Sequence, residues 1–162
     1  MCYLAALRFI PRLRIEAKSS DGLDLDSVAA IISTPDRRYL LQHREDRNDI
    51  LYPNWWGLFG GAREGGEDAE AALRREIMEE LQFMVGECTS FLGCTYDLWF
   101  EGRRTRKIFF TVEMTEPESR GLVLHEGQGM AWLRFNEILA RADQIIPYDL
   151  GMIALHNSQR AT

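Results

Sequence analysis

The spacing of hydrophobic residues changes several times along the chain, and each change predicts a different element. Residues 27–34 form a continuous apolar, β-branched run, which is typical of a buried strand. A turn and a second apolar stretch follow within 35–45, so these two runs predict a hairpin. Residues 94–114 predict a longer hairpin with its tip at 101–103. Apolar residues occupy alternate positions of its second arm, at Ile108, Phe110, Val112 and Met114.

Residues 67–81 are almost all strong helix formers, and they predict the clearest helix of the chain. The residues able to form its apolar side are Ala71, Ala72, Ile77 and Leu81. Two further helices are expected nearer the C-terminus. One is short, over 136–144, with Asn136 as its N-cap, and the other is amphipathic, over 148–159.

The remaining segments complete the order of elements. A polar turn is expected at 115–121, and an extended stretch over 122–135. Because strands, hairpins and helices interleave, the fold class is α/β (α+β) with a mixed sheet. We expect an N-terminal arm or strand over 1–26, which could also pack on the domain or form a dimer contact. The main domain is expected over 27–162, since no repeat or linker divides it.

Composition and charge narrow the classes of function. The chain has 162 residues, of which 46% are hydrophobic, enough for one folded core. Its net charge of -6 argues against binding of duplex nucleic acid by counterion release. An acidic protein binds phosphates only where metal ions or local arginines reverse the field. The three cysteines Cys2, Cys88 and Cys94 are an odd number without metal-site spacing, so neither a disulfide framework nor a zinc site is expected, and a reducing cytoplasm fits best. No apolar run is long enough for a membrane helix.

Acidic residues cluster on the predicted helix behind a glycine-rich loop. Glu76, Glu79 and Glu80 stand at positions i, i+3 and i+4, which brings their carboxylates onto one face of a helix. The loop before them has glycines at 60, 61, 65 and 66, which free the backbone to approach a ligand closely. Carboxylates and bare backbone suit a hard cation such as magnesium.

This stretch has the spacing of a known motif. Gly61 is followed by five residues, Glu67, seven residues, and then Arg75-Glu76-Ile77, Met78 and Glu79-Glu80. The order resembles the Nudix hydrolase signature, G-x5-E-x7-R-E-U-x-E-E-x-G-U with U bulky and apolar, at every charged position. By average residue frequencies, such a match arises by chance less than about once in a million chains. The resemblance implies the Nudix fold, a mixed β-sheet sandwiched between α-helices.

The resemblance also implies a metal site and its chemistry. Magnesium or manganese would be held by Glu76, Glu79 and Glu80 and by the carbonyl of Gly61 or its neighbour Gly60. Water would attack a phosphorus of a diphosphate linkage, and the general base would be Glu79 or Glu80. These two residues and Arg75 form the implied catalytic set. Glu67 is expected to pair with Arg75, which would hold loop and helix in register.

Two positions depart from the family pattern. The glycine that follows the glutamate pair in the signature is Gln82 here, and the proline that commonly precedes the double glycine is Phe59. Neither position supplies a charged ligand. Since glycine is preferred where a helix ends with positive φ, Gly86 is a candidate for that role one turn later.

Other candidate residues lie outside the motif. The segment 125–133, HEGQGMAWL, is similar to the part of MutT-type Nudix proteins that adds a loop carboxylate to the metal cluster, here Glu126. Arg44 ends the second strand at a place where the family often contacts substrate phosphates. Tyr148 and Asp149 follow a proline turn where MutT-like proteins read the nucleobase. The basic run 103–107 reads as a solvated hairpin tip, or as a clamp for a polyphosphate or RNA end.

The leading hypothesis is a magnesium-dependent hydrolase of a nucleoside diphosphate linked to another group, with a MutT-like nucleoside triphosphate first. A nucleotide-sugar or ADP-ribose pyrophosphatase is the alternative enzyme. A Nudix domain that binds nucleotide without turnover is the alternative from another class. The expected partner is a nucleotide-type small molecule, and a homodimer is a further expectation.

Overall fold

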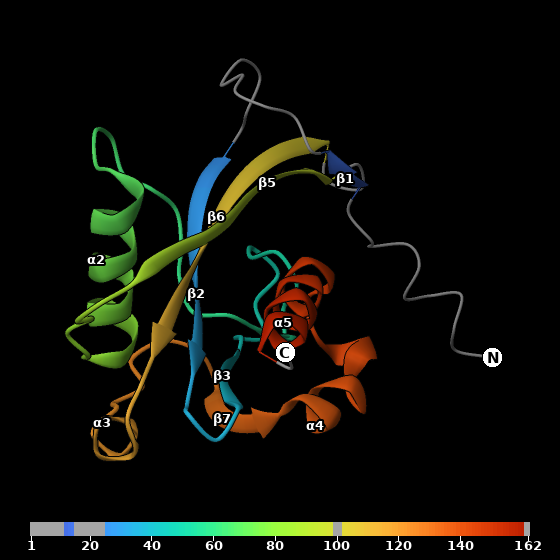
Figure 1. The fold of residues 1–162 in the computed structure, drawn as a ribbon. Helices are drawn as coiled ribbons and strands as arrows, with labels where there is room; N and C mark the ends of the chain where they lie inside the picture. The colour runs from blue at the N-terminus through green and yellow to red at the C-terminus, as the bar shows by residue number, and fades with distance from the viewer. Residues whose placement is uncertain (1–11, 15–24, 99–101, 161–162) are drawn as a thin grey trace.

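A computed structural model describes residues 12–14, 25–98 and 102–160 (Figure 1). Within them the strands form one seven-stranded sheet of order β1-β5-β6-β2-β3-β4, with β7 paired to β3. The strands are β1 Arg12–Arg14, β2 Leu25–Ser33, β3 Arg38–His43, β4 Trp56–Gly57, β5 Thr89–Leu98, β6 Arg103–Glu113 and β7 Gly129–Arg134. The helices are α2 Ala69–Leu81, α3 Glu116–Arg120, α4 Phe135–Leu139 and α5 Pro147–Gln159, with a 3-10 turn at Ala142–Gln144.

The sheet is mixed, as the sequence predicts. β2 runs parallel to β6 along nine pairs, from Leu25 opposite Thr105 to Ser33 opposite Glu113. All other named strand pairs are antiparallel. β2 and β3 are joined by the predicted tight turn, but β2 makes most of its ladder with β6 instead of β3.

Helices cover both faces of the sheet, which confirms the predicted sandwich (Figure 1). α2 packs on one face over a cluster that includes Val28, Ala30 and Ile32 of β2. The alternate residues Ala29 and Ile31 face α5 on the other side. This explains the continuous apolar run, because a central strand covered on both faces has no solvent side. Complete burial of a Leu or Ile side chain stabilises a fold by roughly 1.5–3 kcal/mol, so both helices are firmly anchored.

Several element boundaries differ from the prediction, among them those at α4 and α3. α4 begins at Phe135 with Arg134 as N-cap, so the prediction of Asn136 as N-cap was wrong. The side chain of Glu137 accepts the backbone N–H of Arg134 at 2.7 Å, and this contact fixes the earlier start. The expected polar turn at 115–121 contains the helix α3, where the Glu118 carboxylate accepts the backbone N–H of Thr115 at 2.7 Å.

Part of the expected N-terminal arm is a strand. β1 pairs antiparallel with β5, with Leu13 opposite Tyr96, and so extends the edge of the sheet. Residues 1–11 and 15–24 of the arm, and Glu101 at the predicted hairpin tip, lie outside the described residues, whereas Leu25 and Asp26 begin β2. The division at residue 26 stays a prediction. No helix in the described part of the chain is long and apolar enough to cross a membrane.

Candidate active site

The glycine loop before α2 is bound to the central strand β2. The backbone N–H of Val28 donates to the carbonyl of Gly61, and that of Ala30 donates to the carbonyl of Phe59, both at 2.9 Å. At the other end of the loop, Asp68 caps α2 by accepting the N–H of Ala71 at 2.8 Å. The loop is therefore fixed between the sheet and the helix that follows it.

Two glycines of the loop have no room for a side chain. A Cβ on Gly60 would lie 2.4 Å from the carbonyl oxygen of Val28, and Gly60 has a φ of +131°. A Cβ on Gly61 would lie 2.6 Å from the carboxylate of Glu76. The backbone must therefore be bare here for the helix carboxylates to approach the loop.

Glu80 is a buried carboxylate at the centre of the site. Its side chain turns toward the sheet, and the residue is only 4% exposed. One oxygen accepts the backbone N–H of Gly60 at 2.8 Å, and the other accepts Nε2 of Gln42 at 3.2 Å. Burial, together with the charges of Glu126 and Glu76, raises the pKa of Glu80 to about 8, although the two donors lower it in part.

Glu76 and Glu79 lie on the outer side of the same helix and share one guanidinium. Nη1 of Arg75 donates to Glu76 at 2.9 Å and to Glu79 at 3.1 Å. Burial raises the pKa of Glu76, and Arg75 lowers it in part. Glu79 is 58% exposed, so its carboxylate contacts solvent. The three helix carboxylates thus occupy a gradient from buried to exposed.

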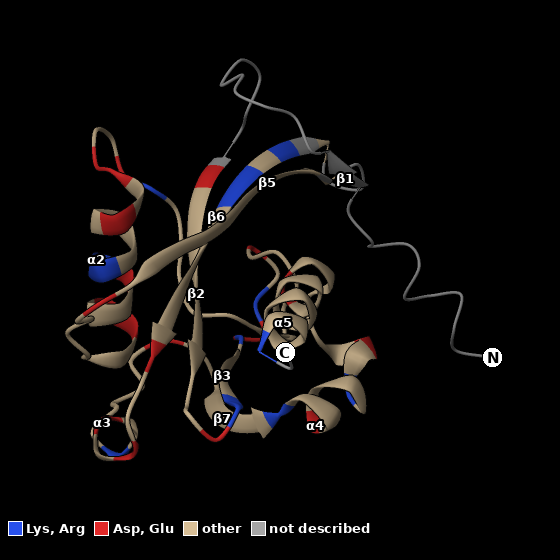
Figure 2. Ribbon diagram, viewed as in Figure 1, with Lys and Arg blue, Asp and Glu red and all other residues tan. Residues whose placement is uncertain are grey.

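The expected ion pair between Glu67 and Arg75 is present. Nη2 of Arg75 donates to Glu67 at 2.8 Å and also to the carbonyl of Ala62 at 3.0 Å. Hydrogen bonding from Arg75 lowers the pKa of Glu67, so Glu67 stays ionised. Arg75 therefore links the loop to the helix (Figure 2, where acidic residues follow α2 and its preceding loop).

Glu126 reaches the cluster from a distant loop. The backbone N–H of His125 donates to the carbonyl of Glu80 at 2.8 Å, and Nε2 of Gln42 donates to the carbonyl of Glu126 at 3.1 Å. Gly127, with a φ of +91°, passes close to the end of β3. This docking places the charge of Glu126 near Glu76 and Glu80, whose pKa values it raises.

Gln82 is the C-cap residue at which α2 ends. Gln82 itself adopts the left-handed conformation, with φ 52° and ψ 35°, and its N–H donates to the carbonyl of Met78 at 3.0 Å. The helix ends at Leu81 as the signature requires. The prediction that Gly86 takes this role was wrong, because the chain has already left the helix before it.

Comparison with known proteins identifies the family. The family model of the NUDIX domain matches residues 24–152. The chain belongs to the Nudix family. Nudix proteins of this kind are hydrolases that act on phosphoanhydride bonds, so the protein is such an enzyme. The sequence is similar to the nucleoside triphosphatase NudI of Escherichia coli O17:K52:H18 (strain UMN026 / ExPEC). The two are 30% identical over 124 residues, which is 72% of this chain and 82% of that protein.

Solved Nudix structures share the fold. The MutT protein from Methanosarcina mazei Go1 has a TM-score of 0.70 at 19% identity, over 89% of this chain and 100% of that one. The E. coli ORF135 protein has a TM-score of 0.67 at 24% identity, over 90% and 96% of the two chains. At these identities the likeness establishes the fold alone, and it confirms the predicted Nudix architecture.

Nudix hydrolases generally use divalent metal cations, and the donors in this site suit one. Glu80 is buried among like charges, a condition that a cation relieves, and carboxylate oxygens match a hard ion. Among the described residues, no three His, Cys, Asp or Glu side chains are grouped closely enough to hold an ion by themselves. Glu79 would have to leave Arg75 to join the others. The donor chemistry therefore fits, with Arg75 competing for the carboxylates of Glu76 and Glu79.

A cavity lies on the side of the glycine loop that faces away from α2. Gly60 and Gly61 form one wall, while Arg44 and residues of β6 and α5 form the others. Nε of Arg44 donates to the carbonyl of Leu51 at 3.2 Å. Arg44 is thus placed at this cavity, and Tyr148 and Asp149 line it from the start of α5.

Sequence reasoning missed two residues, one at the cavity and one beside Glu80. Lys107 belongs to the run interpreted as a solvated hairpin tip or a clamp, yet it lines the cavity and contacts Asp149. It shares its side of β6 with the buried Phe109, so strand alternation was the signal that could have found it. Gln42, which is buried and bonded to Glu80, is a polar residue inside an apolar strand.

Proposed function

We propose that this protein is a magnesium- or manganese-dependent pyrophosphohydrolase of nucleoside triphosphates. The observation that carries the proposal is the shared wall of Gly60 and Gly61. On one side it contacts the carboxylates of Glu80 and Glu76, and on the other it lines the cavity that contains Arg44. A substrate in that cavity would have its phosphates beside the acidic cluster.

The residues that would hold the cation are Gly61, through its carbonyl, and Glu76, Glu79, Glu80 and Glu126. The Gly61 carbonyl already accepts one N–H from Val28 and keeps a second lone pair. A bound divalent ion supplies charge neutralisation for the phosphates and lowers the pKa of water. These roles are supported by the docking of Glu126 against α2 and by the match to the family motif.

The chain's own residues divide the remaining tasks. Arg75, held by Glu67, fixes the outer carboxylates, and the guanidinium of Arg44 suits phosphate oxygens. We assign the general base to Glu79 in preference to Glu80. Glu79 is exposed to water, whereas both oxygens of Glu80 already accept hydrogen bonds from Gly60 and Gln42.

In the proposed reaction, water attacks the α- or β-phosphorus of the triphosphate and its proton passes to Glu79. The new P–O bond forms as the P–O bond of the bridge between the α- and β-phosphates breaks, which releases a nucleoside monophosphate and pyrophosphate. The named relative, a nucleoside triphosphatase, supports this substrate class.

A substrate panel tests the proposal. Purified protein with magnesium or manganese is offered nucleoside triphosphates (ordinary and oxidised), ADP-ribose, nucleotide sugars and dinucleoside polyphosphates, and the released phosphate and nucleotide are quantified. We expect the highest kcat/KM with a triphosphate. Preferential cleavage of ADP-ribose or a nucleotide sugar would contradict the triphosphate substrate and favour a pyrophosphatase of that compound. Binding of nucleotide in calorimetry without any turnover would contradict the enzymatic proposal and favour a ligand-binding domain.

A further inference from the structure

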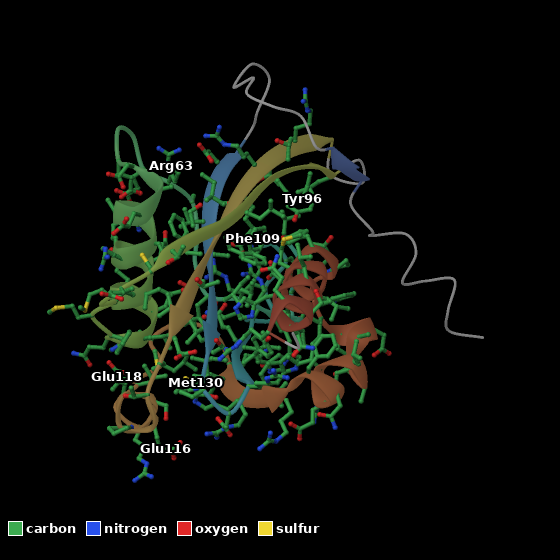
Figure 3. The ribbon with its side chains drawn as sticks, viewed as in Figure 1. Arg63, Tyr96, Phe109, Glu116, Glu118 and Met130 are labelled. Atoms are coloured by element: carbon green, nitrogen blue, oxygen red, sulfur yellow. The ribbon has the colours of Figure 1, made fainter. Side chains whose placement is uncertain are left out.

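A lysine on β6 projects into the cavity beside the start of α5. The Lys107 side chain is 14% exposed, and its Nζ lies 3.3 Å from Oδ1 of Asp149. The ammonium also lies 4.8 Å from the centre of the Tyr148 ring and 5.8 Å from that of Phe109. Phe109 and Tyr96 point from the β5–β6 hairpin toward α5 (Figure 3), so the lysine belongs to an aromatic environment.

Asp149 is fully enclosed, and its oxygens are already engaged. The residue has no exposed surface, and Oδ2 accepts the backbone N–H of Leu58 at 2.9 Å, while Oδ1 accepts Lys107. A ligand in the cavity therefore meets the ammonium of Lys107, whose remaining N–H groups are available as donors. The sequence predicts that Asp149 contacts the nucleobase itself, whereas in the structure Lys107 is the group available to a ligand and Asp149 holds Lys107.

The other cations near the cavity have protein partners of their own. Arg106 and Arg63 are both paired with Asp26, and Arg44 is bonded to Leu51. The cavity wall at Gly60 adjoins the carboxylates, whereas Lys107 adjoins the Tyr148 ring. Phosphates belong at the first wall and an aromatic base suits the second.

We propose that Lys107, positioned by Asp149, donates a hydrogen bond to a ring carbonyl of the substrate's nucleobase and selects 6-oxopurine and 4-oxopyrimidine nucleotides. This inference rests on the proposed function and specifies its substrate class. Lysine has three donors and no acceptor, so it matches O6 of guanine or O4 of uracil. Adenine and cytosine carry an amine at the corresponding position. The amine of such a base would point a donor at a donor, so the N–H groups of Lys107 that Asp149 does not accept would find no acceptor there.

The test compares bases in the wild type and in two variants. We measure kcat/KM for GTP against ATP and for UTP against CTP, with magnesium. The wild type should prefer the oxo base by at least about tenfold in each pair, because a site built around a hydrogen bond rejects the analogue that lacks it. In Lys107→Met, which keeps the stem and removes the charge, both ratios should fall to near one. Arg120→Met removes an exposed cation elsewhere and should leave both ratios unchanged.

Asp149 has a separable role as a positioning residue. Asp149→Asn keeps an acceptor for the N–H of Leu58 but weakens the hold on Lys107. We expect a higher KM for GTP and UTP with little change in kcat, and smaller base ratios. The double variant Lys107→Met/Asp149→Asn leaves no unpaired charge, so it shows the loss of selectivity if the single variant Lys107→Met fails to fold.

Binding provides a readout that does not need turnover. Calorimetry with GMP, AMP, UMP and CMP should give tighter binding of the oxo bases to the wild type and no difference in Lys107→Met. Equal loss for all four nucleotides and for inorganic pyrophosphate would make Lys107 a phosphate contact and overturn the inference, as would a wild type without base preference. Absence of hydrolysis together with selective binding of GMP and UMP would contradict only the proposed function.

Discussion

The backbone N–H of Gly60 donates to the carboxylate of Glu80 at 2.8 Å, across the interface between the glycine loop and α2. This bond joins two ends of one sequence motif, twenty residues apart, into a single wall. Glu80 is buried and its pKa is raised to about 8, so its ionised form needs hydrogen-bond donors. The N–H of Gly60 in the loop is one of them. Loop conformation and carboxylate charge are therefore coupled at this site.

Removal of the charge at Glu79 or Glu80 should abolish metal-dependent turnover. We expect Glu79→Gln and Glu80→Gln to lower kcat/KM by at least about 100-fold, because both residues are proposed to hold the cation directly. Magnesium should raise the melting temperature of the wild type by mass action and should not raise that of Glu80→Gln. Glu64→Gln, on the exposed part of the loop, is the control. Full activity in both variants would contradict the assigned site.

A methyl group at Gly61 should disturb Glu76 in particular. The Cβ of Gly61→Ala would lie 2.6 Å from the Glu76 carboxylate, so that side chain must move. We expect kcat/KM with magnesium to fall about tenfold or more, because Glu76 is one of the proposed ligands of the cation. At Gly65 a Cβ meets nothing within 4 Å, so Gly65→Ala should retain activity. Equal effects of the two substitutions would show that steric contact with Glu76 is not the cause.

The left-handed residue at the end of α2 should be a point of strain. Gln82 has φ 52°, a conformation that glycine adopts without steric cost. We expect Gln82→Gly to raise the free energy of unfolding by about 1 kcal/mol, as measured by denaturant titration, because it relieves that strain. Gly86→Ala has open space around it and should not destabilise the fold. A destabilised Gln82→Gly would mean that the glutamine side chain contributes more than its backbone costs.

Acidification should destabilise the fold through His156. Burial lowers the pKa of His156 below 6.5; the charge of Arg160 lowers it further, and that of Glu113 opposes the shift. The unfolded chain therefore binds a proton first as pH falls through about 6.5, so stability is lost from there down to the folded pKa. His156→Asn should flatten this part of the stability curve, whereas the exposed His125→Asn should not. An unchanged slope in His156→Asn would place the titrating group elsewhere.

The motif was readable from sequence because its chemistry depends on residue types at fixed spacing. A helix over 67–81 places Glu76, Glu79 and Glu80 on neighbouring turns whatever surrounds it. The alternating and continuous apolar runs likewise predicted the strands of a mixed sheet, and the resemblance to the family implied its cover of helices on both faces. Helix starts such as that of α4 were less predictable, because a single side chain, that of Glu137, moved the boundary.

The differences among the three helix glutamates were not readable. The burial of each carboxylate depends on which side of α2 packs against the sheet. It also depends on contacts with Gln42 and Gly60, which belong to other segments. In the same way, Lys107 lies in a basic run that suggests solvent. Only the pairing of β6 with β2 and the packing of α5 bring it to Asp149.

The sequence by itself determined the family motif, the interleaved strands and helices of a mixed sheet, and the set of acidic residues, since each follows from local spacing and periodicity. The sandwich architecture was implied by the resemblance to the family. Tertiary structure decided which carboxylate is buried, which carboxylate contacts the glycine loop, and that Lys107 lines the cavity. Those properties depend on desolvation and on distances between segments far apart in the chain. Neither quantity is encoded by any single stretch of residues.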